Sequence, residues 1–192
     1  MRLNTTAYYR NLSRDPTRPA GELYYCLMAL VLSVRVVQTH DFFIFLIALR
    51  YWIMSFLTAI RLPPDKPILL QHRVISYISF FMPMFFQPAL LSISSIQYSL
   101  GRGLGILGSV LSITAMLHLG KRFGASPAKR GEICRSGLYR WLKHPIYIGY
   151  GITELGGALL NPINILLFLI SASLFIMRAR IEEAVLEEHP AT

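Results

Sequence analysis

Side chains that could hold a polar cofactor gather in the last third of the sequence. They are Tyr139, His144, Pro145, Tyr147, Gly149, Glu182 and Glu183. Phenols, an imidazole and carboxylates together offer hydrogen-bond donors, acceptors and negative charge. The helix expected to start at Pro145 adds unpaired backbone N–H groups. This mixture suits a cofactor that carries a carboxylate, an ammonium, ribose hydroxyls and an adenine.

The spacing of this set predicts that its two halves meet. Two apolar segments, 146–160 and 163–177, separate them, with Asn161-Pro162 between the segments. Proline lacks an N–H donor and clashes with the preceding turn, so this dipeptide ends one helix and starts another. The segments therefore form a tight helical hairpin, which returns Glu182 and Glu183 to the end that carries His144. The plainer alternative is an interfacial anchor of aromatic and basic side chains.

Two charged residues fall inside apolar segments. Glu154 is about 15 Å along the helix from His144, and Arg50 is about as deep when counted back from Arg61. Charges at such depth are costly and usually face the protein interior or a water-filled cavity. We expect Glu154 and Arg50 either to pair or to face a substrate cavity together, or else to form an ion pair that only fixes the helix packing.

The elements that position these residues are transmembrane helices. Of the 192 residues, 54% are hydrophobic and only 15% are charged, whereas soluble domains carry about 25% charged residues. The fold class is therefore an all-α polytopic transmembrane bundle of about six spans. The predicted spans are Leu23–Val37, Phe42–Ile60, Val74–Ile96, Leu104–Leu119, Ile146–Leu160 and Ile163–Met177. Pro83 and Pro88 predict a kink in the third.

The basic residues predict the orientation. Sixteen of the 19 Lys and Arg fall in alternate segments, and short basic loops stay on the cytoplasmic side. The chain is thus expected in the bacterial inner membrane or the endoplasmic reticulum, with both termini cytoplasmic. The net charge of +9 follows from this topology and from attraction to membrane lipids. No nucleic-acid partner is expected, and the two cysteines lack metal-type spacing, so no metal site is predicted.

Three regions follow from this assignment. Residues 1–22 form a cytoplasmic tail, residues 23–119 form four transmembrane helices that supply the scaffold and the substrate cavity, and residues 120–192 form the region with the candidate cofactor site. Small residues at small-xxx-small spacing in and just before the fourth span, Gly101, Gly105, Gly108 and Ser109, predict a close helix contact.

The motifs resemble those of the isoprenylcysteine carboxyl methyltransferase family, and more loosely those of phospholipid N-methyltransferases. The similar pattern is Gly-x-Tyr, Arg/Lys-His-Pro-x-Tyr-x-Gly, a helical hairpin and Arg-x-x-x-Glu-Glu, over about Gly120 to Glu188. The resemblance implies that S-adenosylmethionine is the cofactor, with S-adenosylhomocysteine as product. It also implies a lipophilic small molecule or prenylated substrate that arrives from the bilayer. The implied cofactor contacts are Tyr139, His144, Pro145, Tyr147, Gly149, Glu182 and Glu183.

The reaction implied by this resemblance is an in-line methyl transfer, which depends mainly on positioning. A carboxylate acceptor of the isoprenylcysteine type needs no base, and Arg140 or Arg178 could orient it. An amine or phenol acceptor needs a base, for which His144 and Glu154 are the candidates.

Two other classes of protein share parts of this pattern. Membrane sterol reductases carry a related His-x-x-Tyr-x-Gly motif that serves NADPH, and a non-catalytic membrane scaffold could keep the helices alone. The reductase pattern places asparagine before the tyrosine and an acid after the glycine, where this chain has Ile146 and Tyr150. These two differences count against a reductase, and the paired glutamates fit the methyltransferase pattern better.

Overall fold

The computed structural model describes residue 15, residues 17–90 and residues 93–187 of the chain. These residues form helices and no strand, which confirms the all-α class for this part of the chain. The α-helices are α2 (Thr17–Thr39), α3 (Phe42–Ile60), α4 (Leu70–Phe81), α5 (Ser95–Leu119), α6 (Pro145–Leu160) and α7 (Asn164–Glu187). The short 3-10 helices are η1 (Met82–Phe85), η2 (Gly120–Arg122) and η3 (Gly137–Arg140).

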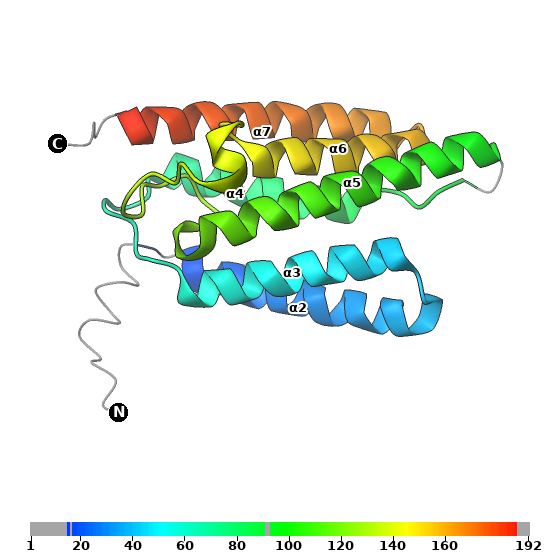
Figure 1. Ribbon diagram of the computed structural model, residues 1–192, viewed down its shortest axis with the longest axis horizontal. Coiled ribbons are helices and arrows are strands. Elements are labelled where there is room, and N and C mark those ends of the chain that lie inside the picture. Colours follow the sequence, from blue (N-terminus) through cyan, green and yellow to red (C-terminus); the bar gives the residue numbers. More distant parts are fainter. Residues whose placement is uncertain (1–14, 16, 91–92, 188–192) are drawn as a thin grey trace.

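The helices lie side by side along the long axis of the molecule and alternate in direction (Figure 1). The starts of α2, α4 and α6 and the ends of α3, α5 and α7 gather at one end, on the left of Figure 1. We call this the loop end, because the long connection from Gly120 to His144 also lies there. The start of α2 and the end of α7 therefore lie at the same end of the bundle.

The outer faces of the helices are apolar. Leu23, Phe56 and Leu166, from three different helices, are 63%, 62% and 65% exposed. Among the described residues, four helical stretches are long and apolar enough to cross a membrane, namely α2, α3, α7 and α5 continued through η2 to Arg122. The shorter α4 and α6 have 12 and 16 residues. The predicted polytopic transmembrane bundle is confirmed, with lipid as the solvent that its exposed leucines and phenylalanines require.

The third predicted span, Val74–Ile96, is wrong as a single kinked helix. Helix α4 ends at Phe81, the short η1 follows, and the described residues from Phe86 to Ser94 are not helical. Pro83 and Pro88 explain the difference, because each removes a backbone donor and clashes with the preceding helical turn. Two prolines this close end the helix instead of bending it.

The non-helical segment is held by the turn between α6 and α7. The Gln87 backbone N–H donates to Asn164 Oδ1 at 2.8 Å, and Asn164 Nδ2 returns a hydrogen bond of 2.9 Å to the Gln87 carbonyl. Asn161 Nδ2 donates to the Pro88 carbonyl at 2.9 Å. Irregular backbone is tolerated at membrane depth only where protein satisfies it in this way. The predicted hairpin at Asn161-Pro162 is confirmed, and its asparagines also support a distant segment.

Helix α2 starts at Thr17, earlier than the predicted Leu23. Asp15 accepts a hydrogen bond of 2.7 Å from the Thr17 hydroxyl, and its carboxylate pairs with Arg61 at 2.9 Å and Arg130 at 3.3 Å. This buried cluster ties the start of α2 to the end of α3 and to the loop before α6. Of the predicted tail, residues 1–14 and 16 lie outside the described residues.

The glycines of α5 make a close helix contact against α6. A Cβ on Gly108 would lie 2.5 Å from the Gly149 carbonyl oxygen and 2.5 Å from the Thr153 nitrogen. A Cβ on Gly156 would lie 2.4 Å from the Gly101 carbonyl oxygen. These are backbone atoms that cannot rotate away. The predicted small-residue contact is therefore present, and it fixes α6, which carries His144 and Tyr147.

We expect Gly108→Ala to lower the unfolding free energy by about 1–3 kcal/mol, because the added methyl group forces α5 and α6 apart. Gly103→Ala is the matched control: it lies on the same helix, and a Cβ there meets nothing within 4 Å. Melting temperatures of the two variants in detergent measure the difference. Equal melting temperatures would contradict the importance of this contact.

Candidate functional site

Gly137 sets the position of the first predicted site residue. Its φ is +57°, and a Cβ there would lie 2.1 Å from the His118 ring. Only glycine adopts this conformation easily and leaves room for the imidazole. The turn η3 can therefore pack against the end of α5, and Tyr139 within it lines the cavities described below. The structure thus explains why a glycine precedes Tyr139 in the Gly-x-Tyr motif.

Pro145 is the first residue of α6, where its missing N–H costs nothing. His144 caps this end, and Tyr147 lies three residues further on, so both side chains occupy one face of the helix start. Their rings are stacked with centroids 5.7 Å apart. Tyr147 in turn stacks on Phe175 of α7 at 6.0 Å. This aromatic column orients the imidazole and the phenol toward α7.

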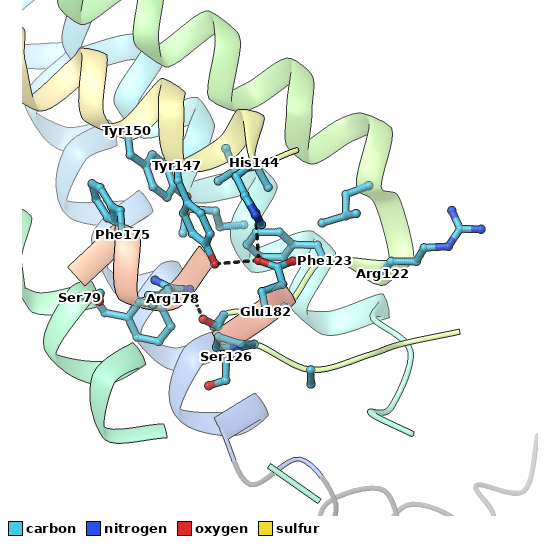
Figure 2. A pocket seen from close by; sticks show the side chains of 18 of the residues that line it. Ser79, Arg122, Phe123, Ser126, His144, Tyr147, Tyr150, Phe175, Arg178 and Glu182 are labelled. Atoms are coloured by element: carbon cyan, nitrogen blue, oxygen red, sulfur yellow. Dashed lines mark hydrogen bonds and ion pairs between the residues drawn. The ribbon is translucent and has the colours of Figure 1, made fainter. Parts of the chain in front are cut away.

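The paired glutamates of α7 meet these two side chains. His144 Nε2 lies 3.1 Å from Glu183 Oε1, and His144 Nδ1 lies 3.7 Å from Glu182 Oε2. The Tyr147 hydroxyl donates to Glu182 Oε2 at 3.2 Å. Lys143 adds a 3.4 Å contact to Glu183. Figure 2 shows His144 and Tyr147 pointing from α6 toward Glu182 on α7.

Arg178 lies one helical turn before Glu182, on the same face of α7. Its guanidinium lies over the Tyr147 ring at 5.2 Å and the Phe80 ring at 5.7 Å, and it donates to the Ala125 carbonyl. The side chain is buried, and its Nε has no hydrogen-bond partner. The arginine therefore brings a positive charge and an unused donor into the site.

Tyr139 is held neutral by its surroundings. Burial raises its pKa above the usual value, and the nearby Glu182 carboxylate raises it further. A tyrosine with a raised pKa keeps its proton at neutral pH and can donate a hydrogen bond. Tyr139 thus keeps a proton that it can donate to a ligand in either cavity that it lines.

Two cavities with shared walls open around this cluster. The entrance cavity, about 440 Å³, lies between the loop 131–135, Lys143 and the end of α7. The central cavity extends from His144, Arg178 and Glu182 into the bundle. Tyr139, His144, Glu182 and Arg130 line both. The predicted residues therefore lie at the boundary between the entrance cavity, which opens at the loop end, and the central cavity inside the bundle.

A third cavity lies deeper among the helices. This apolar cavity has a volume of about 410 Å³ and is walled by α2, α3, α5 and α6 and by the non-helical segment 86–89. It shares Arg50, Tyr51 and Tyr150 with the central cavity. The Arg50 guanidinium lies over the Tyr150 ring at 5.1 Å. Arg50, Tyr51 and Tyr150 therefore form the junction between the central cavity, which is polar at the loop end, and the apolar cavity.

The predicted site residues divide by location. The structure brings together Tyr139, His144, Tyr147, Arg178, Glu182 and Glu183. Pro145 is fully buried beneath them, and Gly149 faces α5, where a Cβ would lie 2.7 Å from the Ser112 nitrogen. Arg140 is exposed and lies over the Trp141 ring at 5.4 Å. Glu154 lines the apolar cavity, away from the cluster.

Glu154 and Arg50 do not form an ion pair within the described part of the chain, but both line the apolar cavity. Of the two arrangements expected from the sequence, the structure has the shared cavity. Each side chain is buried and keeps an atom without a hydrogen-bond partner, Oε2 of Glu154 and Nη1 of Arg50.

Sequence reasoning assigned a substrate cavity to residues 23–119 but, apart from Arg50, named none of the residues there that line a cavity. Tyr24, Tyr51 and Phe80 line the central cavity, as does the loop 122–128. The only sequence feature that could have identified these residues as cavity-lining is the presence of tyrosines inside apolar spans. Such tyrosines also occur in an ordinary protein core. Arg130 is one of the sixteen basic residues from which the orientation is predicted, yet it is buried, pairs with Asp15 and lines two cavities.

Comparison with known proteins finds a family match in the second half of the chain. Residues 102–188 match the Isoprenylcysteine carboxyl methyltransferase (ICMT) family. No curated protein matches the chain significantly. The matched segment runs from α5 to the end of α7 and includes every residue of the cluster around His144 and Glu182.

Proposed function

We propose, from the membership of residues 102–188 in the isoprenylcysteine carboxyl methyltransferase family, that the protein moves a methyl group from S-adenosylmethionine to a lipophilic carboxylate. The family and the four spanning-length helices support a membrane methyltransferase. The observation that carries the choice of methyl donor is the contact of His144 and Tyr147 with the paired Glu182 and Glu183.

The side chains of the cluster fit the groups of this donor. Glu182 and Glu183 can accept hydrogen bonds from an ammonium and from ribose hydroxyls. Arg178 and Arg130 each keep a buried Nε without a partner, and a carboxylate is the acceptor that a guanidinium binds best. The ring of Tyr139 offers a face for a cation or an adenine. When bound, the donor supplies an electrophilic methyl group on a sulfonium.

The chain's own contribution to the reaction is positioning and charge. A carboxylate acceptor has no proton to lose, so no general base is needed. Arg50, at the junction of the central and apolar cavities, can hold the acceptor's negative charge there, and Arg178 can do so from the polar side. The apolar cavity would take the lipophilic part of an isoprenylcysteine-like acceptor directly from the bilayer.

The first test is ligand binding to the purified protein in detergent. At a hundred times its dissociation constant a ligand adds about 2.7 kcal/mol to the unfolding free energy, or roughly 5–11 °C in melting temperature. We expect S-adenosylhomocysteine to produce such a shift and NADPH to produce none. A shift with NADPH alone would favour a membrane reductase and would overturn the proposal.

The second test identifies the acceptor. Membranes that contain the protein are incubated with methyl-labelled S-adenosylmethionine, and the labelled product is extracted and analysed. We expect a lipid methyl ester, which mild alkali releases as labelled methanol. A base-stable labelled amine would point instead to a phospholipid N-methyltransferase.

A further inference from the structure

Tyr25 of α2 has a buried hydroxyl with no hydrogen-bond partner among the described residues. The side chain is 1% exposed and lines the central cavity. A buried polar atom without a partner is costly to maintain, and a phenylalanine at this position would avoid the cost. The presence of the hydroxyl in the wall of the central cavity therefore calls for a chemical explanation.

Neighbouring tyrosines in the same cavity wall use their hydroxyls within the protein. The Tyr24 hydroxyl donates to the Phe80 carbonyl at 2.5 Å. The Tyr150 hydroxyl donates to the Met54 sulfur at 3.6 Å. The Tyr25 hydroxyl has no such partner in the described part of the chain, so it can donate to a ligand without giving up a bond to the protein.

Tyr25 shares an aromatic neighbour with each of the two arginines that could hold the acceptor's negative charge. Its ring lies 6.3 Å from the Tyr51 ring, and the Arg50 guanidinium lies over that same Tyr51 ring at 6.0 Å. Its ring also meets Phe80 edge-on at 5.5 Å, and the Arg178 guanidinium lies over Phe80 at 5.7 Å. The charge of Arg178 acts on the Tyr25 phenol. A negative group held by these arginines would therefore lie close to Tyr25.

A carboxylate is the group that suits these three side chains. Like the Tyr25 hydroxyl, Arg50 Nη1 and Arg178 Nε are buried donors without a partner among the described residues. A carboxylate brings two oxygens with about four acceptor sites and no donor of its own. An ammonium brings only donors, so it would leave all three groups unpaired beside two like charges.

We propose that the Tyr25 hydroxyl donates a hydrogen bond to the carboxylate of the acceptor in the central cavity and so positions it for methyl transfer. One oxygen is held by this bond. The other oxygen forms the new bond to the methyl carbon, sulfur keeps the electron pair of the broken bond, and no proton moves. The inference rests on the proposed function for the class of acceptor. It goes beyond it by assigning acceptor binding to a residue of α2, outside the segment 102–188 that matches the family.

Two matched probes test the proposal. N-acetyl-S-farnesylcysteine carries the carboxylate, and N-acetyl-S-farnesylcysteamine has a hydrogen in its place. Their dissociation constants are measured by thermal shift in nanodiscs without cofactor, for wild-type protein and for Tyr25→Phe, so that the partition of each probe into lipid is the same for both proteins.

We expect Tyr25→Phe to bind the carboxylate probe about tenfold to a hundredfold more weakly, because a hydrogen bond to a charged group is lost. The probe without the carboxylate should keep its wild-type affinity. An unchanged affinity for the carboxylate probe, or an equal loss for both probes, would overturn the proposal, as would wild-type protein that does not bind the carboxylate probe.

Melting temperatures without ligand separate acceptor binding from a structural role. Tyr25→Phe should melt no lower than the wild-type protein, because it removes a buried hydroxyl that has no partner among the described residues. Tyr24→Phe is the comparison, because it removes the hydrogen bond to the Phe80 carbonyl and should melt about 1–6 °C lower. A similar loss in Tyr25→Phe would mean that its hydroxyl supports the fold, and the proposal would be wrong.

Tyr77→Phe is the control for binding. Tyr77 contacts the same Phe80 ring, with the centroids 6.1 Å apart, but it lines none of the three cavities. The variant makes the same chemical change as Tyr25→Phe and should bind both probes like the wild-type protein. A selective loss of the carboxylate probe in Tyr77→Phe as well would contradict the assignment to Tyr25.

The same proteins separate this inference from the proposed function. Selective loss of the carboxylate probe in Tyr25→Phe, with no methyl transfer to that probe by the wild-type protein, would count against the proposed reaction alone. A wild-type kcat/KM for methyl transfer in Tyr25→Phe would count against the role of Tyr25 alone.

Discussion

Glu182→Gln is expected to weaken S-adenosylhomocysteine binding about tenfold to a hundredfold and to lower kcat/KM for methyl transfer at least as much. Glu182 touches both His144 and Tyr147 and lines both cavities at the loop end. Glutamine has the same shape and can still accept from Tyr147, so the helices should stay in place. What it loses is the negative charge, and hydrogen bonds to charged groups are the stronger ones.

Isothermal titration with S-adenosylhomocysteine and a labelled-methyl assay measure this effect. Glu22→Gln is the control, because it makes the same chemical change at the same end of the bundle on a residue that lines neither cavity. If Glu182→Gln bound S-adenosylhomocysteine with wild-type affinity, the assignment of this carboxylate to the cofactor site would be wrong.

Arg178→Lys is expected to have the second largest effect, on stability and on binding together. The lysine keeps the charge but loses the planar group that lies over Tyr147 and Phe80 and reaches the Ala125 carbonyl. The lost contacts are worth about 1.5–3 kcal/mol, or roughly 3–12 °C in melting temperature. Ligand affinity should fall about tenfold, because the new ammonium cannot bind a carboxylate through two parallel hydrogen bonds.

Arg180→Lys provides the comparison for this variant. Arg180 lies half a turn further along α7 and is exposed, so the same substitution should change neither melting temperature nor affinity measurably. If both variants behave alike, the stacked position of Arg178 has no energetic importance.

The positions of His144, Tyr147, Glu182 and Glu183 could be predicted because they depend on local rules. A proline starts one helix, Asn161-Pro162 separates it from the next, and the lengths of the two helices return their polar ends to one side. The third segment could not be predicted in the same way. Its hydropathy suits a spanning helix, and the partners that stabilise its non-helical form, Asn161 and Asn164, lie far along the sequence.

The same limit applies to the charged residues. Hydropathy indicates that Arg50 and Glu154 are unusual, but whether two such side chains pair or share a cavity depends on the spacing of helices. That spacing is decided by the glycine contact between α5 and α6 and by the packing of α2 on α3. Asp15, Arg61 and Arg130 come together from three distant parts of the chain. No local sequence pattern predicts such a cluster.

The hydrogen bonds between segment 87–88 and the asparagines of the last turn have a consequence for biosynthesis. During synthesis the segment emerges well before Asn161 and Asn164, so its Gln87 N–H and its Gln87 and Pro88 carbonyls have no protein partners at first. Exposed to lipid, such groups are costly, and the segment must remain near water or the insertion machinery until the final hairpin arrives. The wall that this segment contributes to the apolar cavity can therefore take its final form only after Asn161 and Asn164 have been synthesised.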